Sequence, residues 1–385
     1  MEHRLEELFD LQMGKTPARN NPRYWGTTDN KWISIADLSK CGKYIKETKE
    51  YLSDVAIAES GISQIPANTV IMSFKLSIGK TAITYEPMYS NEAIMSFRDK
   101  HFVDLLPEYI YYLLVAHNWD EGTNKAVMGK TLNKATLSKV KVHIHPLEKQ
   151  EKIVSILNKL TDAIQEHQQQ LQKLDELIKS RFVELFGDPI MNPKGWEVVT
   201  IGDITTEVRY GTSKPAVEGG RYPYLRMNNL TIDGHLDLTE LKYIDIPDDE
   251  IEKCVVRKGD ILFNRTNSIE LVGKTAVFDF PDDMVIAGYI IRVRLNTKMF
   301  PEVLSQYMNL EAIRDILRSM AKGAVNQANI NAQELQSIRV YVPDIELQKQ
   351  FVEMKEQIDK SKLHKFVTSQ YDILKEGIYN AVIQN

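Results

Sequence analysis

The sequence predicts an α+β protein in which two similar, mixed and β-rich domains are separated by two long antiparallel coiled-coil helices, with a pseudo-twofold internal repeat. Three observations predict this fold. Gly79-Lys80-Thr81-Ala82 recurs as Gly273-Lys274-Thr275-Ala276, and Pro107-Glu108 recurs at the same spacing as Pro301-Glu302. Each half ends with a short apolar strand, a proline and a helix, and the first of these helices carries an apolar heptad pattern. A period near half the chain is too long for a solenoid and indicates two copies of one domain.

The repeat sets the predicted domain boundaries. We place the first domain at residues 1–146, a central spacer helix at 147–187, the second domain at 188–345 and a C-terminal spacer helix at 346–385. A chain of 385 residues is long enough for two to three domains.

Short apolar and β-branched runs between turn residues predict the strands of both domains. They are Trp32 to Ile35, Thr69 to Phe74, Thr81 to Tyr85, Tyr222 to Met227, Asp260 to Asn264, Lys274 to Phe278 and Val285 to Arg294. One helix per domain begins with a proline in its first turn, at Pro107 to about Val115 and at Pro301 to about Met320.

The central spacer helix is predicted from about Leu147 to Phe186 by apolar residues that alternate in steps of four and three. These are Ile153, Leu157, Leu160, Ile164, Leu171, Leu174 and Ile178, with His167 as the polar member of the seam. Gly187 suits a left-handed helix end, and Pro189 prevents the helix from continuing.

The second spacer helix is predicted from about Leu347 to the end of the sequence, with a less regular seam that includes Leu374 and Ile378. Antiparallel packing would let each seam cover the other. The alternative is that each helix packs back on its own domain, which would leave a large apolar stripe in water.

The composition limits the classes of protein to which the chain can belong. No run of 18 apolar residues and no charged-then-apolar start is present, so we expect neither a membrane span nor a secretory signal. Cys41 and Cys254 occupy unrelated points of the two repeats and have no metal-ligand spacing. We therefore expect no metal site, reduced thiols and a cytoplasmic location. The net charge of −5 counts mildly against nucleic acid, but only as an average.

Local charge is more informative, because basic residues cluster with aromatic and amide side chains in both repeats. Arginine, asparagine and glutamine can read base edges, whereas lysine mostly neutralises phosphate. Each cluster alone is also typical of a solvated face, but the recurrence favours nucleic acid. The candidate DNA-binding residues are Lys15, Arg19, Arg23, Tyr24, Trp25, Lys75, Lys80, Lys130, Lys134, Arg209, Lys214, Arg221, Arg226, Asn228, Arg265, Asn267, Lys274, Lys322, Asn326 and Gln327.

A search for catalytic motifs finds none with the required context. Gly-Lys-Thr occurs four times, but a phosphate-binding loop needs a glycine five residues earlier. Those positions hold Phe9, Phe74, Asn124 and Ser268. No nucleophile elbow and no metal-ligand spacing is present either. The sequence therefore predicts a binding protein rather than an enzyme.

Taken together, these motifs resemble the DNA specificity subunit of type I restriction–modification systems over the whole chain. The opening Leu8-Phe9-Asp10 through Gly14-Lys15-Thr16-Pro17 to Tyr24-Trp25-Gly26 is similar to the start of a target-recognition domain in that family. Asn329-Ile330-Asn331, the following strand and Pro343 are similar to the end of one. The stretch from Ser180 to Pro189 is similar to the end of a central spacer.

The resemblance implies a non-catalytic subunit that reads a bipartite, asymmetric site in double-stranded DNA. It implies as partners two methyltransferase subunits docked on the spacer helices, and restriction/translocase subunits. S-adenosylmethionine, ATP and Mg²⁺ would be bound by those partners, and adenine would be flipped out for methylation. Two alternatives remain: the recognition region of a fused methyltransferase–endonuclease, and a coiled-coil scaffold without a DNA role.

Overall fold

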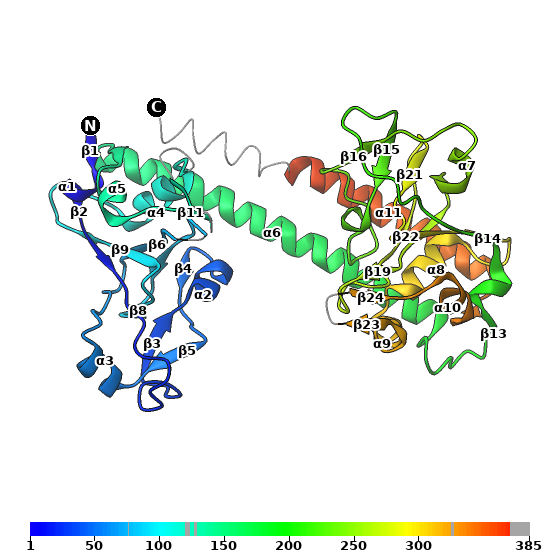
Figure 1. Ribbon diagram of the computed structural model, residues 1–385, viewed down its shortest axis with the longest axis horizontal. Coiled ribbons are helices and arrows are strands. Elements are labelled where there is room, and N and C mark those ends of the chain that lie inside the picture. Colours follow the sequence, from blue (N-terminus) through cyan, green and yellow to red (C-terminus); the bar gives the residue numbers. More distant parts are fainter. Residues whose placement is uncertain (76, 120–123, 127–128, 325–326, 370–385) are drawn as a thin grey trace. The chain divides into compact units, whose positions relative to one another are not determined.

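The computed structural model describes residues 1–75, 77–119, 124–126, 129–324 and 327–369, with the backbone alone described at 124–126, 129–131, 324 and 363–369. The chain divides into two compact units. The first is Met1–Glu166 with Thr368–Asn385, and the second is His167–Val367. The boundary falls inside the longest helix, so each unit contains part of it (Figure 1).

The first unit is built from short strands and helices. Its strands are β1 (Glu2–Arg4), β2 (Phe9–Met13), β3 (Asn30–Ile33), β4 (Tyr44–Ile45), β5 (Glu50–Leu52), β6 (Val70–Ser73), β7 (Thr81–Thr84), β8 (Tyr89–Ser90), β9 (Ile94–Asp99), β10 (Asn124–Ala126), β11 (Gly129–Thr131) and β12 (Lys141–His143). Its helices are α1 (Leu5–Leu8), α2 (Ile35–Lys40), α3 (Asp54–Ser60), α4 (Pro107–Ala116), α5 (Lys134–Ser138) and the start of α6 (Leu147–Phe186).

Two sheets organise this unit. The larger has the order β2-β9-β6-β7-β4 and the smaller the order β5-β3-β8, in which β3 and β8 are parallel. The first strand, β1, pairs antiparallel with β12, the strand that immediately precedes α6. Helix α4 covers the larger sheet, because its Tyr109 and Ile110 share one core with Val70 and Met72 of β6.

The second unit contains corresponding elements. Its strands are β13 (Glu197–Thr200), β14 (Thr205–Tyr210), β15 (Tyr222–Leu225), β16 (Lys242–Ile244), β17 (Val255–Val256), β18 (Ile261–Asn264), β19 (Thr266–Asn267), β20 (Thr275–Val277), β21 (Met284–Ile286), β22 (Ile290–Leu295), β23 (Lys322–Ala324), β24 (Gln327–Asn329) and β25 (Arg339–Val342). Its helices are η1 (Ile201–Ile204), η2 (Met227–Asn229), α7 (Ile251–Cys254), α8 (Pro301–Met308), α9 (Glu311–Met320), α10 (Ala332–Ser337) and α11 (Ile345–Ser369), together with the end of α6.

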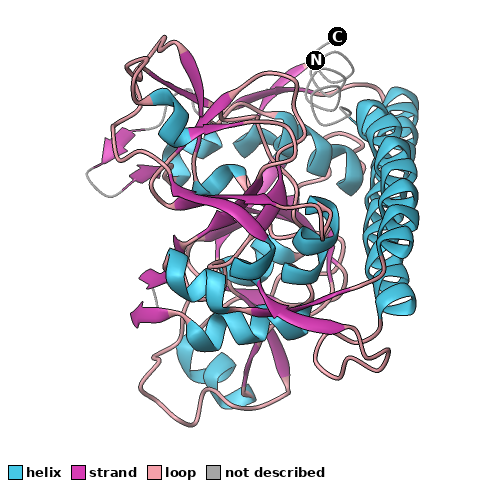
Figure 2. Ribbon diagram, turned by 90° about the vertical axis from the view of Figure 1, so that its right-hand side faces the viewer, coloured by secondary structure: helices cyan, strands magenta, loops and turns pink. Residues whose placement is uncertain are grey.

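The strand pairings confirm the internal repeat. The order β14-β22-β18-β20 of the second unit matches β2-β9-β6-β7 of the first. The parallel pair β15–β21 matches β3–β8, and β13–β25 closes the second unit as β1–β12 closes the first. The fold class is α+β, as predicted, because each unit contains helices and mixed sheets. Figure 2 shows the helices and strands in different colours.

Two elements of the second domain were predicted to be continuous, but each is divided into two. The helix expected from Pro301 to Met320 is two helices, α8 and α9, separated at Asn309 and Leu310. The Asn309 side chain binds the backbone N–H and C=O of Thr275, which ties this break to β20. The strand expected from Val285 to Arg294 is likewise divided into β21 and β22, with Gly288 between them.

The central spacer helix has the predicted bounds, Leu147–Phe186. The residue that follows the helix, Gly187, has a φ of 87°, which suits glycine, and the Phe186 carbonyl accepts a hydrogen bond from Trp196 Nε1 at 2.8 Å. Within the second unit, α6 and α11 pack antiparallel. Phe351, early in α11, contacts Phe182 and Phe186, whereas Lys362 further along α11 binds Asp175 earlier in α6.

The apolar seam of α6 lies on its less exposed side. Ile153 and Leu157 are buried in the core of the first unit, and Ile178 is buried in that of the second. The remaining seam residues, Leu160, Ile164, Leu171 and Leu174, are half-buried. At its start the seam therefore packs on the adjoining domain, as the alternative expected. Leu374 and Ile378 lie outside the described residues.

Candidate nucleic-acid interface

The N-terminal basic cluster is held together by aromatic stacking. The Arg19 guanidinium lies 3.9 Å from the centroid of the Trp25 ring and 4.7 Å from that of Trp32. The two indoles meet edge to face at 5.1 Å, and Arg19 also forms a two-pronged ion pair with Glu50. Stacking and pairing fix the plane of this guanidinium, which limits how it can reorient toward a ligand.

The neighbouring residues of this cluster are also engaged. Arg23 lies 3.6 Å from a carboxylate oxygen of Glu59, and the Tyr24 hydroxyl donates to the same carboxylate at 2.9 Å. This hydrogen bond to Glu59 raises the pKa of Tyr24. The Lys15 ammonium donates to the carbonyl of Ser60. The predicted residues are thus brought together on the loop before β3 and beside α3.

The remaining candidates of the first domain occupy separate places. Lys80 and Lys134 are exposed, and Lys75 is half-buried with its ammonium 5.2 Å from the Phe74 ring centroid. Lys130 lies in β11, where the backbone alone is described.

In the second domain, the strongest grouping surrounds β19. Arg265 stacks over the Tyr210 ring at 4.9 Å and donates to Asn329 Oδ1 at 3.1 Å. Asn329 in turn donates to Thr266 Oγ1 at 2.8 Å, and β19 pairs with β24 of the β23–β24 hairpin. This pairing places Asn267 beside the hairpin that carries Lys322 and Gln327. Two segments that the sequence separates widely therefore form one polar cluster. Asn326 lies outside the described residues.

A second grouping forms where β15 ends. Arg226 precedes the turn η2, and its backbone N–H donates to Asn229 Oδ1 at 2.8 Å. The Arg226 guanidinium donates to the carbonyl of Glu240 at 3.3 Å, whereas the Asn228 side chain is exposed. The buried Asn229 therefore holds the turn, and Asn228 presents its amide to solvent.

Four other basic candidates of this domain have carboxylate partners. Arg209 pairs with Glu207, Lys214 with Glu250, Arg221 with Asp248 and Lys322 with Glu334. These hydrogen bonds lower the pKa of Glu250 and of Glu334. All four basic side chains are exposed, and ion pairs of exposed groups are weak, so a phosphate can replace the carboxylate at small cost.

Lys274 differs from the other candidates because its side chain is buried, with 5% of its surface exposed. Its ammonium donates to the carbonyls of Met227 and Leu230, and burial lowers its pKa. In this structure Lys274 therefore stabilises the turn that carries Asn228 and presents no charge to a ligand. Its sequence counterpart Lys80 is exposed, so the shared Gly-Lys-Thr-Ala motif does not have the same role in both domains.

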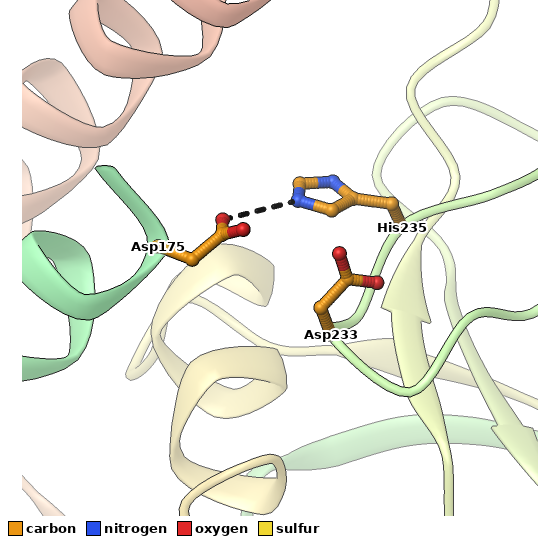
Figure 3. Close-up of side chains that lie close together, drawn as sticks. All are labelled: Asp175, Asp233 and His235. Atoms are coloured by element: carbon orange, nitrogen blue, oxygen red, sulfur yellow. Dashed lines mark ion pairs between the residues drawn. The ribbon is translucent and has the colours of Figure 1, made fainter. Parts of the chain in front are cut away.

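One group of potential ligand atoms was not anticipated from the sequence. Asp175, Asp233 and His235 have ligand atoms within 4.8 Å of one another (Figure 3). Lys362 already binds the Asp175 carboxylate, and His235 Nε2 lies 4.0 Å from it. The ammonium neutralises Asp175 without a metal. Asp175 lies far from Asp233 and His235 in the sequence, so no local spacing could have revealed the group.

Comparison with known proteins gives the family. The model of the type I restriction modification DNA specificity domain matches residues 1–176 and 193–370. The MjaIX specificity subunit of a type I restriction enzyme from Methanocaldococcus jannaschii is 27% identical over 252 residues, which are 59% of this chain and 57% of that protein. The EcoKI specificity subunit of Escherichia coli is 24% identical over 241 residues, 58% of this chain and 52% of that protein. The chain thus spans little more than half the length of these relatives.

Two solved structures share the fold. The S subunit of a type I restriction–modification system from M. genitalium superposes with a TM-score of 0.55 at 12% identity, covering 100% of this chain and 95% of that one. A chain from a study of complex assembly in the type I restriction–modification system gives 0.57 at 17% identity, with coverage of 100% and 97%. Because the family model matches both halves, the chain belongs to the family of type I restriction modification DNA specificity domains and contains two of them.

Proposed function

We propose that this chain is a non-catalytic, sequence-specific DNA-binding subunit that reads the two halves of a bipartite, asymmetric DNA site. The observation that carries the proposal is the twofold match of one specificity domain, each copy of which extends into a long helix. Two DNA-recognition domains in one chain suit a DNA site of two parts.

The polar side chains differ between the two domains where the scaffold is the same. The strand β18 leads into Arg265 and Asn267, whereas the corresponding strand β6 leads toward Lys75. Arginine and asparagine present two planar hydrogen-bonding groups to base edges, whereas lysine presents a single ammonium. Each domain therefore reads its own bases, and the site is asymmetric.

The partners belong to the same proposal. Two methyltransferase subunits bind the spacer helices and methylate adenine with S-adenosylmethionine, and restriction/translocase subunits add ATP- and Mg²⁺-dependent cleavage. We place the complex in the cytoplasm. Among the helices that the structure describes, none has the length and apolar composition needed to cross a membrane.

Methylation mapping tests this proposal. Genomic DNA from cells that express the methyltransferase subunits, with and without this chain, is sequenced by a long-read method that detects methylated adenine. We expect a motif of two short specified parts separated by an unspecified gap, present only with the chain. A continuous or palindromic motif, or no difference, contradicts the proposal. Salt-dependent binding of the purified complex to duplex DNA separates it from a scaffold without a DNA role.

A further inference from the structure

Two glutamines occupy matching positions at the start of the two spacer helices. Gln150 lies in the first turn of α6 and Gln348 in the first turn of α11. Both side chains are completely buried, with 0% of their surface exposed. Glutamine is mostly an exposed residue, and burial of its amide is costly unless every polar group is hydrogen-bonded.

Gln150 satisfies its amide with three backbone groups of the first unit. Its Oε1 accepts from the N–H of Leu106 at 3.0 Å, and Leu106 is the residue that caps α4. Its Nε2 donates to the carbonyl of Asp104 at 2.8 Å and to that of His145 at 2.9 Å. The side chain therefore joins the loop before α4 to the connection that enters α6.

Gln348 makes the same three bonds in the second unit. Its Oε1 accepts from the N–H of Phe300 at 2.9 Å, and Phe300 caps α8. Its Nε2 donates to the carbonyls of Lys298 at 3.1 Å and Pro343 at 2.9 Å. The two units thus contain the same joint, although Gln150 follows a lysine and Gln348 follows a leucine.

A tyrosine completes each joint. The Tyr109 hydroxyl in α4 donates to the carbonyl of His143 in β12 at 3.0 Å, and that of Tyr307 in α8 donates to the carbonyl of Arg339 in β25 at 3.3 Å. The helix that begins with proline is therefore bound both to the strand before the spacer and to the first turn of the spacer. Each spacer helix is anchored at its base to two elements of its own domain.

We propose that Gln150 and Gln348 are positioning residues that fix the direction in which each spacer helix leaves its domain, and that they thereby set how sharply the complex selects the gap between half-sites. The proposal rests on the proposed function. The lever is long, because the 40 residues of α6 span about 60 Å at 1.5 Å per residue. A tilt of about 10° at the base displaces the far end by about 10 Å, or about three base pairs at 3.4 Å each.

The test uses methionine, which keeps the length of glutamine but none of its hydrogen bonds. Gln150→Met and Gln348→Met are made in the full chain, in its complex with the methyltransferase subunits. Binding is measured on duplexes that differ only in gap length. Two control variants test the two simpler explanations, which are a general effect of replacing a glutamine in the spacer helix and a general loss of stability. Gln165→Met changes an exposed glutamine of α6, and Leu262→Ala destabilises the second unit at a fully buried residue away from the joint.

A positioning role and a merely structural role give different results. If the joint sets the direction of the spacer helix, the methionine variants lose affinity most at the optimum gap length. The ratio of the affinity at the optimum gap to the affinity at neighbouring gaps then falls toward one. Leu262→Ala lowers the unfolding temperature and weakens binding at every gap length by the same factor. Gln165→Met changes neither the unfolding temperature nor the affinity at any gap length. Methionine variants that fold and keep the wild-type ratio overturn the proposal.

A second measurement needs no DNA and uses milder variants if methionine prevents folding. Spin labels are attached at Lys242→Cys in β16 and Lys360→Cys in α11, both exposed, after Cys41 and Cys254 are replaced by alanine. The distance distribution between them should broaden in Gln348→Asn, which keeps the amide but is one methylene too short to make all three hydrogen bonds. An unchanged width in that variant overturns the proposal.

The two measurements also separate this inference from the proposed function. If the wild-type complex shows no preferred gap, the proposed function fails, whatever the labels report. If the wild type has a preferred gap and the labelled variant keeps its narrow distribution, the function stands and the joint is not what sets direction.

Discussion

Two arginines of the second domain show how far the role of a charged residue depends on its neighbours. Arg292 is fully buried and binds the carbonyl of Val255 and the carboxylate of Glu207. Arg265 is half-buried, stacks on Tyr210 and lies in the polar cluster at β19. Both are simply basic residues in the sequence, and only the fold distinguishes the structural arginine from the candidate DNA contact.

Among the base-reading candidates, Asn228 gives the clearest test, because it is exposed and Asn229, not Asn228, holds the turn. Asn228→Ala should cost ~1–3 kcal/mol of binding at the second half-site and relax one base position there. Binding to duplexes with single substitutions in each half-site measures this. Gln333→Ala, at another exposed amide of the same unit, is the control. Equal losses at both half-sites would place Asn228 outside the reading surface.

Lys134 should behave as a phosphate contact. It is exposed at the start of α5, and an exposed lysine ammonium is a common contact to phosphate. Lys134→Ala should weaken all sequences alike and lower the slope of log affinity against log salt by about one. A salt titration of wild type and variant checks this. A change confined to one base position would instead assign Lys134 to base reading.

Glu207 links charge to stability. A hydrogen bond from Arg209, with the charges of Arg292 and Arg294, lowers its pKa. The stability it contributes is therefore present above the unfolded pKa and lost as the pH falls through the lower folded pKa. Glu207→Gln should cost about 3 kcal/mol at pH 7, because Arg292 keeps its charge and loses its carboxylate. Urea unfolding should show the two proteins converging in acid. Glu184→Gln, in an exposed pair with Arg181, should change little.

At the scale of elements, the contact between α6 and α11 depends on Phe351. This side chain is fully buried and meets Phe182 and Phe186 edge to face at 5.4 Å and 5.6 Å. Phe351→Ala should lower the free energy of unfolding of the second unit by ~3–5 kcal/mol, because it leaves a cavity in the aromatic contact. Val183→Ala, at an exposed residue next to Phe182, serves as the control. A similar loss of stability in both variants would show that the aromatic contact contributes no more than an exposed side chain of α6.

The sequence predicted helices and strands well where the signal was local, and less well where contacts with distant residues determine where an element ends. The heptad pattern predicted α6, Gly187 and Pro189 marked its end, and the proline signal located the start of α4 and α8. The break between α8 and α9 was missed, because it is stabilised by Asn309 binding Thr275 across the unit.

At the scale of the whole molecule, the internal repeat made the fold class predictable, because each motif could be checked against its copy. The candidate site was harder to predict. The cluster of Arg265 and Asn267 with the β23–β24 hairpin depends on strand pairing across the second unit, and the burial of Lys274 depends on a turn far from it in sequence. Periodicity reveals which face of an element is apolar, but it does not reveal which polar residues meet.

The spacer helices should act as a ruler for the gap. Inserting four residues near Gln168 and near Gln370 adds about 6 Å at 1.5 Å per residue. Base pairs are about 3.4 Å apart, so the preferred gap should grow by one or two base pairs. The insertion also turns one domain about the helix axis, so some affinity should be lost. Binding to duplexes of different gap length measures this. A folded variant with an unmoved optimum would show that the helices only connect the domains.

The pairing of β1 with β12 and of β13 with β25 has an evolutionary consequence. The first and last strands of each domain are hydrogen-bonded partners, so the polypeptide enters and leaves each domain at one place. A stretch of gene that encodes one such domain can therefore be exchanged as a block, and the incoming domain brings both partners of its closing pair. New specificities can then arise by recombination between related genes, while the other half of the protein is inherited unchanged.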